Sequence, residues 1–288
     1  MERCDFLPVS AEEMHERGWW WYDALVVGGD AYVDHPSFGT AVISRVLEAE
    51  GLRVAVLAQP DWHDAEAFRA MGRPRLGVFI GAGNLDSMVA HYTAAKRRRS
   101  EDFYSPGKRS GCRPDRAAIV YCNRAREAFG PDMPIILGSL EASLRRFAHY
   151  DYWDDSVRRA ILFDAPADLL VYGMGEAATI EIAHRLKKKQ SVRTMTDIPG
   201  TGYITRDPSV CKFDHITLPS FEDVRDDKRL YAEATRTEYA EHDPIRGRAM
   251  IQPCEGRYLI INPPAMPLDT KELDRVAELP YTREWHPM

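Results

Sequence analysis

The chain has 288 residues, which is enough for one large domain or two ordinary ones. Apolar residues make up 44% of it, so a real core can be buried. The 38 Lys and Arg against 44 Asp and Glu give a net charge of −6, which argues against a protein whose whole surface is built for nucleic acid. No apolar run approaches the roughly 20 residues of a membrane span, and the acidic start of the chain is not a secretory signal. We therefore expect a cytoplasmic protein.

The cysteines are scattered along the chain, at Cys4, Cys112, Cys122, Cys211 and Cys254. They form no C-x-x-C pair and have no regular spacing. An odd number of cysteines at such positions predicts reduced thiols, as in the cytosol. It also predicts that the chain by itself holds no zinc or iron–sulfur ligand set.

Short apolar runs alternate with helical patterns over the first 190 residues, which is the pattern of a parallel sheet covered by helices. The runs predict buried strands at 24–29, 53–58, 76–81, 135–137 and 168–172. Helical spacing between and after them predicts helices at 38–47, 114–129 and 176–189. The predicted fold class is therefore α/β, with a doubly wound, mainly parallel five-stranded sheet of the Rossmann-like type.

The pattern weakens beyond residue 190 into turns rich in Pro, Gly, Asp and Thr. A charged helical stretch follows at 221–241, then a predicted strand at 258–261 and a predicted helix at 269–279. We expect residues 1–190 to form the doubly wound domain and residues 191–256 to form a linker and accessory helical segment.

The loops that follow the predicted strands carry the candidate binding residues. Open parallel sheets bind ligands outside the carboxyl ends of their strands, and glycine in such loops lets the backbone approach a ligand closely. We therefore predict a cofactor pocket whose loops contain Asp30, His35, Gly39, Gly81, Gly83, Gly138, Ser139, Gly173, Gly175 and Glu176, with His35 at its rim. The alternative is that each glycine only makes a tight strand-to-helix turn.

One of these loops matches a dinucleotide-binding pattern. Residues 173–178 read G-x-G-x-x-A, follow a strand and open a helix. The fingerprint belongs at the first strand-to-helix turn, whereas this one follows the fifth strand, and Glu176 would face a pyrophosphate as a like charge. A nicotinamide or flavin dehydrogenase is therefore a minor alternative.

Two other polar features admit a chemical and a structural interpretation. His35 could ligate a metal or transfer protons, but a lone loop histidine more often makes a hydrogen bond or a cap. The stretch 149–155 (HYDYWDD) could bind a metal through its carboxylates. The structural interpretation is that Asp154 or Asp155 caps a helix that packs Val157, Ile161 and Leu162 inward.

A basic stretch covers residues 96–113. It opens with Lys-Arg-Arg-Arg, includes Phe103 and Tyr104, and ends at Arg113. Arginines beside aromatic rings could grip phosphates and stack a base, which is the basis for an RNA-binding alternative. Two acidic residues interrupt the run, and charge runs are usually solvated loops. We expect a surface loop with weak, salt-sensitive affinity for nucleic acid.

Six longer stretches resemble the N-terminal region of YgiQ-type radical S-adenosylmethionine (SAM) proteins. In order they are GDAYVDHPSFG at 29–39, AQPDW at 58–62, HYTAAKRRRSEDFYSPG at 91–107, EASLRRFAHYDYWDD at 141–155, LLVYGMGE at 169–176 and INPPAMPL at 261–268. The resemblance implies a cobalamin-binding-like doubly wound domain, followed by a radical SAM barrel. Residues 257–288 would then be the lead-in to that barrel.

The resemblance also implies cofactors and an activity for the full-length protein. A C-x-x-x-C-x-x-C loop would hold a [4Fe-4S] cluster, and reductive cleavage of SAM would give a 5′-deoxyadenosyl radical. This chain has no such triplet. Cobalamin is a further cofactor that the fold suggests, but Asp34 and His35 are adjacent here, which departs from the D-x-H-x-x-G motif of histidine-ligated cobalamin.

The functional prediction from the sequence is therefore the N-terminal part of a radical SAM enzyme of unknown substrate. The competing prediction is a non-catalytic binding module that contacts RNA or a partner protein through the basic stretch 96–113.

Overall fold

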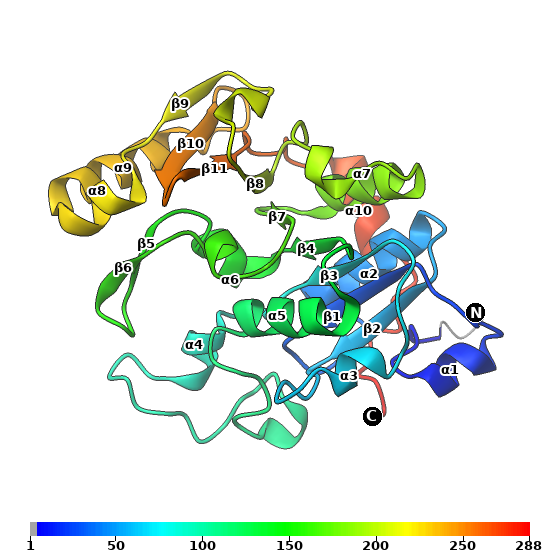
Figure 1. The fold of residues 1–288 in the computed structure, drawn as a ribbon. Helices are drawn as coiled ribbons and strands as arrows, with labels where there is room; N and C mark the ends of the chain where they lie inside the picture. The colour runs from blue at the N-terminus through cyan, green and yellow to red at the C-terminus, as the bar shows by residue number, and fades with distance from the viewer. Residues whose placement is uncertain (1–4) are drawn as a thin grey trace.

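The computed structural model describes residues 5–288. Nine strands form one mixed sheet in the order β2-β1-β3-β4-β7-β8-β11-β10-β9 (Figure 1). Its parallel half consists of β1 (Ala24–Gly28), β2 (Val54–Ala58), β3 (Gly77–Ile80), β4 (Ile135–Leu137) and β7 (Leu169–Val171). These are the five predicted strands, so the predicted doubly wound parallel sheet is confirmed. The switch in strand order lies between β1 and β3.

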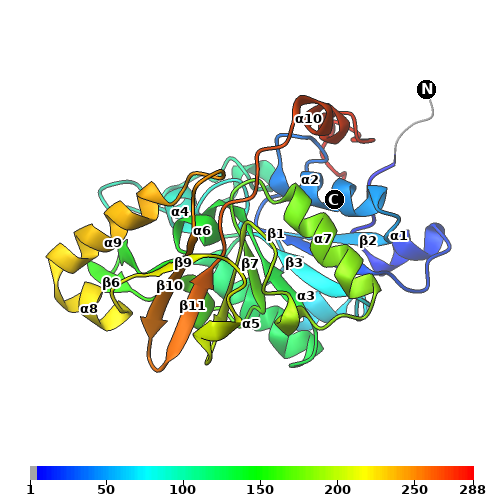
Figure 2. The same cartoon turned by 90° about the horizontal axis from the view of Figure 1, so that it is seen from above.

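Helices cover both faces of this parallel half. The helices α2 (Gly39–Ala49) and α7 (Glu176–Lys187) pack together on one face, and α3 (Glu66–Arg69) and α5 (Ala117–Phe129) pack together on the other (Figure 2). Shorter helices, α1 (Ala11–Glu16), α4 (Ser87–His91) and α6 (Ser139–Leu144), precede or connect the strands. The predicted helices after the first, third and fifth strands are thereby confirmed.

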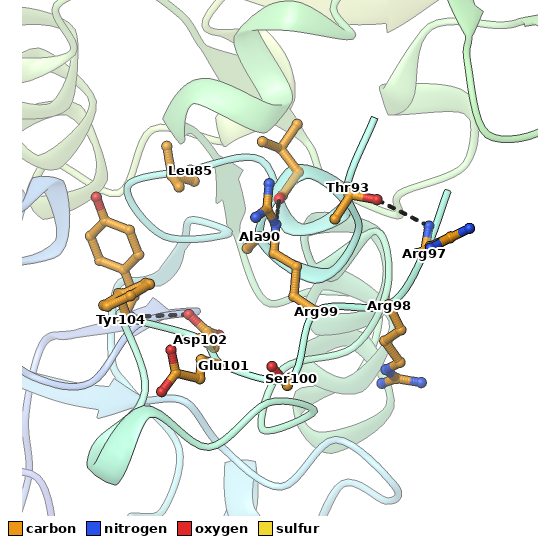
Figure 3. Close-up of a pocket in the computed structure, with 12 residues that line it drawn as sticks. Leu85, Ala90, Thr93, Arg97, Arg98, Arg99, Ser100, Glu101, Asp102 and Tyr104 are labelled. Atoms are coloured by element: carbon orange, nitrogen blue, oxygen red, sulfur yellow. Dashed lines mark hydrogen bonds between the residues drawn. The ribbon is translucent and has the colours of Figure 1, made fainter. Parts of the chain in front are cut away.

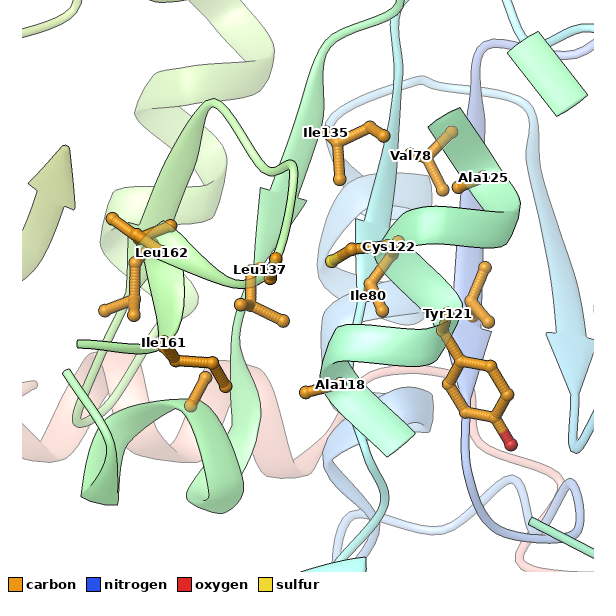
Figure 4. Packing of buried hydrophobic residues seen from close by; sticks show 14 of the residues in the cluster. Val78, Ile80, Ala118, Tyr121, Cys122, Ala125, Ile135, Leu137, Ile161 and Leu162 are labelled. Atoms are coloured by element: carbon orange, nitrogen blue, oxygen red, sulfur yellow. The ribbon is translucent and has the colours of Figure 1, made fainter. Parts of the chain in front are cut away.

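Buried side chains of the strands form one hydrophobic cluster on each face of the sheet. Successive side chains of a strand point to opposite faces, so Leu25 and Val27 pack with α5, whereas Val26 packs with α2 and α7. Figure 4 shows the α5 side, where Tyr121 and Cys122 lie against the sheet. Because both faces are covered, the strands are apolar throughout, which is why they could be predicted from the sequence.

The sheet does not stop at residue 190. It continues through β8 (Thr201–Thr205), β11 (Arg257–Ile261), β10 (Ala249–Cys254) and β9 (His215–Thr217). The pairs β7/β8, β8/β11 and β11/β10 are antiparallel, and β9 is parallel to β10. Residues 191–256, expected as linker and accessory helices, thus supply three strands to the same sheet. Their polar positions, as in the Thr-Gly-Tyr-Ile-Thr of β8, hid them from a search for apolar runs.

The charged stretch 221–241 forms two helices instead of one. They are α8 (Phe221–Asp226) and α9 (Lys228–Ala240), and Asp227 ends the first and caps the second. The side chain of Asp227 accepts a hydrogen bond from the backbone N–H of Arg229, which satisfies an otherwise unpaired donor of α9. The predicted strand at 258–261 and the predicted helix at 269–279 are confirmed as β11 and α10 (Thr270–Ala277).

The stretch 149–155 was wrongly expected to lead into a capped helix. It forms a hairpin of β5 (His149–Asp151) and β6 (Ser156–Arg158), followed by a 3-10 turn at Ile161–Phe163. The carboxylate of Asp151 accepts hydrogen bonds from the N–H groups of Trp153 and Asp154, which turns the chain back before a helix can begin.

The C-terminal segment 281–286, which we call the strap, returns to the loop after β1. Asp34 N–H donates to the carbonyl of Glu284 over 3.0 Å, and His286 N–H donates to the carbonyl of Tyr32 over 2.8 Å. The buried carboxylate of Asp34 also accepts the Thr282 N–H at 2.9 Å and pairs with Arg45. Within residues 5–288, no helix has the length and apolar character needed to cross a bilayer.

Candidate functional site

A cavity of about 330 Å³ lies at the carboxyl edge of the parallel strands. The loops after β1, β3, β4 and β7 all contribute to it, as a parallel sheet requires of loops that follow its strands. Eight of the predicted residues line this carboxyl-edge pocket, namely Gly39, Gly81, Gly83, Gly138, Ser139, Gly173, Gly175 and Glu176. The structure therefore brings together residues that are up to 137 positions apart between Gly39 and Glu176.

The walls of the carboxyl-edge pocket are mainly apolar. Val27, Ile80 and Val171 come from strand ends, and Ile43 comes from the first turns of α2. The hydroxyl groups of Thr40, Ser139 and Thr179 are among the few polar groups on the wall. Apolar walls with a small number of placed polar groups are typical of small-molecule sites.

Close contacts hold three of the pocket loops together. A Cβ on Gly29 would lie 2.0 Å from the carbonyl oxygen of Ala82, so no larger residue fits there without moving backbone. The Ser139 hydroxyl accepts the Ala82 N–H at 3.1 Å, and Ser139 itself is left-handed with φ 77°. The loops after β1, β3 and β4 are thus fixed to one another by contacts that tolerate little change.

Two long helices begin at the pocket without side-chain caps. The capping positions of α2 and α7 are Phe38 and Gly175, and neither makes a side-chain cap hydrogen bond. The first N–H groups of a helix carry partial positive charge and need acceptors, one of which Asn84 supplies to Gly39 at 3.2 Å. These helix ends can therefore donate hydrogen bonds to a bound molecule.

Glu176 supplies an acceptor beside those donors. It lies in the first turn of α7, where a negative side chain suits the helix dipole. Its Oε2 atom is buried and has no hydrogen-bond partner among residues 5–288. Such atoms are uncommon in folded proteins, since a buried carboxylate oxygen without a partner is costly. A ligand that carries an N–H or O–H group would satisfy it.

Asp30 is close to the pocket but does not line it. Its carboxylate accepts the Asn84 N–H at 2.7 Å and pairs with Arg113 at 2.8 Å, and Arg113 also pairs with Asp102 at 2.8 Å. Burial raises the pKa of Asp30, and the Arg113 guanidinium opposes that rise. The group therefore acts as a clamp that holds the loop after β1 to the loop after β3. Sequence reasoning missed Arg113 and Asp102, because both stand in a charge-rich stretch that resembles a solvated loop.

His35 lies next to the pocket residues Pro36 and Ser37. Its Nδ1 atom accepts the Ser37 N–H at 3.1 Å, which is a local turn-stabilising bond. The neighbouring Asp34 is fully buried and pairs with Arg45, so it does not orient the imidazole. These contacts do not fit a histidine that ligates the cobalt of cobalamin.

The basic stretch 96–113 lies on the surface, as predicted, although Asp102, Ser105 and Arg113 are buried. It surrounds a separate open hollow of about 580 Å³, shown in Figure 3 with Arg97, Arg98 and Arg99 on its wall. Lys96 reaches the hairpin β5–β6, where it donates to the Trp153 carbonyl at 3.2 Å.

The carboxylates of the β5–β6 hairpin are used in ion pairs. Asp151 and Asp154 both pair with Arg116, at 3.0 and 2.7 Å. No cluster of three or more His, Cys, Asp or Glu side chains suited to a metal ion is found within residues 5–288. The metal-binding interpretation of this stretch therefore has no structural support.

The cysteines do not form a site for an iron–sulfur cluster in the described part of the chain. Cys112, Cys122, Cys211 and Cys254 are free thiols at separate places in the fold, and Cys4 lies outside the described residues. Burial raises the pKa of the Cys122 thiol, and it raises that of Cys254 to about 12. Protonated thiols inside a core are poor metal ligands. A [4Fe-4S] cluster therefore does not fit the residues present, and no step through one is derived for them.

A family model and similar proteins both relate the chain to one family. A family model described as "Radical SAM N-terminal" matches residues 6–288. UPF0313 proteins of Clostridium botulinum (strain 657 / Type Ba4) and Clostridium perfringens (strain 13 / Type A) are 53% and 51% identical over 288 residues. These matches cover 100% of this chain but only 45% and 43% of the relatives, so the chain spans less than half of their length.

A solved structure also matches part of the chain. It is the radical S-adenosylmethionine methyltransferase TsrM from Kitasatospora setae, with cobalamin and a [4Fe-4S] cluster bound. The match covers 62% of this chain and 26% of that protein, with 19% identity and a TM-score of 0.38. The family assignment depends on the sequence matches, which extend over the whole described fold and confirm the resemblance to YgiQ-type proteins: the chain belongs to the Radical SAM N-terminal family.

Proposed function

We propose that this chain is the N-terminal part of a radical SAM enzyme that generates a 5′-deoxyadenosyl radical in its full-length form. Family membership over residues 6–288 supports the proposal. The [4Fe-4S] cluster and SAM would be held outside this chain, because its own cysteines form no ligand set in the described residues.

Within that enzyme, the role we assign to the chain is to hold a small molecule in the carboxyl-edge pocket. The observation that carries this role is the convergence of four post-strand loops on one apolar cavity with an unpartnered Glu176 oxygen at its wall. Donors from the ends of α2 and α7 and the Glu176 acceptor would orient the ligand, and the apolar wall would exclude water. If the ligand is cobalamin, it binds without His35 as a cobalt ligand.

The first experiment tests the enzyme class. The full-length protein is reconstituted anaerobically with iron and sulfide, and 5′-deoxyadenosine is measured by mass spectrometry with and without a low-potential reductant. We expect SAM cleavage only with the reductant. Reconstituted protein that carries four irons per chain and still forms no 5′-deoxyadenosine would refute the enzyme class.

The second experiment tests the pocket. Gly138 has extended backbone and room for a side chain, so Gly138→Leu should fill the cavity without strain. The matched control is Ala177→Leu, which adds the same side chain at an exposed position of α7. Cobalamin titration followed by absorbance should show binding to wild type, to the control and to His35→Ala, but not to Gly138→Leu. Equal binding by Gly138→Leu would contradict the pocket assignment.

A second candidate function is a non-catalytic module that contacts RNA or a partner protein through the basic stretch 96–113. The observation in its favour is the exposed row Arg97–Arg99 beside an open hollow. Phosphate contacts would make the affinity fall steeply with salt, since each neutralised phosphate releases counterions. Tight binding of a transfer RNA at physiological salt, lost in the triple alanine variant of Arg97, Arg98 and Arg99, would favour this candidate over the enzyme.

A further inference from the structure

Large apolar side chains are exposed at the same edge of the sheet as the pocket. We call this set the carboxyl-edge strip, and its members are Val89, Phe103, Leu140, Leu144 and Met174, which are 49%, 73%, 45%, 60% and 46% exposed. Single exposed apolar residues are common on protein surfaces, whereas contiguous ones mark interfaces. The positions of the five side chains relative to one another therefore decide whether the strip is an interface.

Contacts between α4 and α6 connect the middle of the strip. Arg145, just after α6, pairs with Asp86, the residue that caps α4. The buried carboxylate of Glu141 in α6 accepts the Ser87 N–H of α4 at 2.8 Å. The start of α4 is thus held against α6, which places Val89, two residues after Ser87, near the residues that α6 exposes.

The two cavities connect the ends of the strip. Val89 and Phe103 both line the hollow of Figure 3. At the other end, Met174 lines the carboxyl-edge pocket together with Ser139, which directly precedes Leu140. Leu140 and Leu144 are four residues apart, so they lie on one face of α6. Members of the strip therefore lie at both cavities and on α6, and Arg97, Arg98 and Arg99 line the hollow at one end, as charged residues line the rims of interfaces.

We propose that the carboxyl-edge strip is the surface on which the remainder of the full-length protein packs. This inference rests on the proposed function, in which a longer chain completes the enzyme. More than half of each relative lies outside the matched part, since this chain spans 45% and 43% of their lengths. The strap holds residues 281–286 against the loop after β1, at the same edge. In this proposal the remainder of the full-length protein covers both the strip and the mouth of the pocket.

The test uses the full-length protein with a protease site inserted directly after residue 288. After cleavage, the two parts should co-elute in size exclusion for wild type. The double substitution Leu140→Glu and Leu144→Glu should separate them, with the dissociation constant raised about 100-fold or more, because two apolar anchors become charges. Both positions are exposed on a helix, so the fold should remain intact, which the melting temperature checks.

Trp20→Glu is the matched control. Trp20 is 79% exposed and precedes β1, so it lies at the opposite edge of the parallel strands. Its substitution should leave the cleaved parts together. Separation of the wild-type parts, or co-elution of the double variant, would overturn the proposal. So would a double variant whose only change is the loss of a dimer in light scattering, or co-elution that ends on nuclease treatment, since these identify a second copy or RNA as the occupant.

The 5′-deoxyadenosine assay keeps this inference separate from the proposed function. It is performed on uncleaved protein, where the covalent link remains. Association that depends on the strip without SAM cleavage would refute the enzyme class and leave the docking surface. If SAM is cleaved and the two parts of the double variant still associate, the docking surface is refuted and the enzyme class stands.

Discussion

The two halves of the sheet differ in where the loops between their strands lie. In the parallel half, β2-β1-β3-β4-β7, every strand runs in the same direction, so every post-strand loop reaches one edge. In the mixed half, β8-β11-β10-β9 with α8 and α9, neighbouring strands mostly alternate, so their connections are divided between both edges. The loops of the parallel half therefore meet in the carboxyl-edge pocket.

Carboxylates in the two halves illustrate two ways of compensating buried charge. In the parallel half, Asp30, Asp102 and Asp34 are each paired with a buried arginine. In the mixed half, the half-buried Glu238 of α9 makes no ion pair within residues 5–288, and burial raises its pKa to about 7 although the charge of Arg146 opposes the rise. Charge in the first case is compensated by a cation, and in the second by a proton. Each of the following substitutions tests one side of this comparison.

The largest effect is expected for Arg113→Ala. The substitution leaves the carboxylates of Asp30 and Asp102 buried without their cation, so the free energy of unfolding should fall by about 3–5 kcal/mol. Urea unfolding followed by circular dichroism measures the change. The control is Arg246→Ala, which breaks the exposed pair with Asp243 in the mixed half and should leave the midpoint unchanged. Equal effects of the two variants would contradict the role of the buried Arg113 in compensating the two carboxylates.

Two glycine-to-alanine substitutions compare how well a pocket loop and a strand of the mixed half accommodate an added Cβ atom. At Gly29→Ala, the new Cβ would lie 2.0 Å from the backbone oxygen of Ala82, which the surrounding strands hold in place. At Gly202→Ala in β8, it would lie 2.4 Å from Cδ1 of Ile261, the movable end of a side chain. We expect losses in the free energy of unfolding of about 3 and about 1 kcal/mol. A larger loss at Gly202, measured by the same urea titrations, would contradict the idea that the pocket loops are the less tolerant part.

A smaller effect than that of Gly29→Ala concerns pH and Glu238. Its folded-state pKa of about 7 exceeds the ordinary 4.5, so the folded state binds this proton more tightly than the unfolded state. The stabilisation is therefore complete below pH 4.5 and is lost as the pH rises to 7. Because solvent reaches the side chain, we expect a loss of about 1–2 kcal/mol. Glu238→Gln should abolish it, so the difference between wild type and variant, measured from pH 4 to 8, should change across that interval; a constant difference would contradict the assignment.

Sequence reasoning succeeded where a single physical signal dominates. The strands of the parallel half are buried on both faces and appear as apolar runs, and the edge rule for parallel sheets was enough to gather the glycine loops into one pocket. The prediction failed where one sequence pattern is compatible with more than one local structure. The alternating β8 resembles a loop, the aspartates 151, 154 and 155 favour turns as well as helix caps, and a buried Arg113 looks the same as a solvated one. In these cases the structure depends on contacts between residues far apart in the sequence, which the pattern of a single segment does not reveal.

The strap is synthesised long after the loop that it contacts. The Thr282 N–H that meets the Asp34 carboxylate is 248 residues further along the chain. At the usual rate of synthesis, about 5–20 residues per second, Asp34 leaves the ribosome roughly 10–50 s before that donor exists. During this interval the loop after β1 has Arg45 but not the strap. This contact at the loop after β1 is therefore completed after the strands of the sheet have been synthesised.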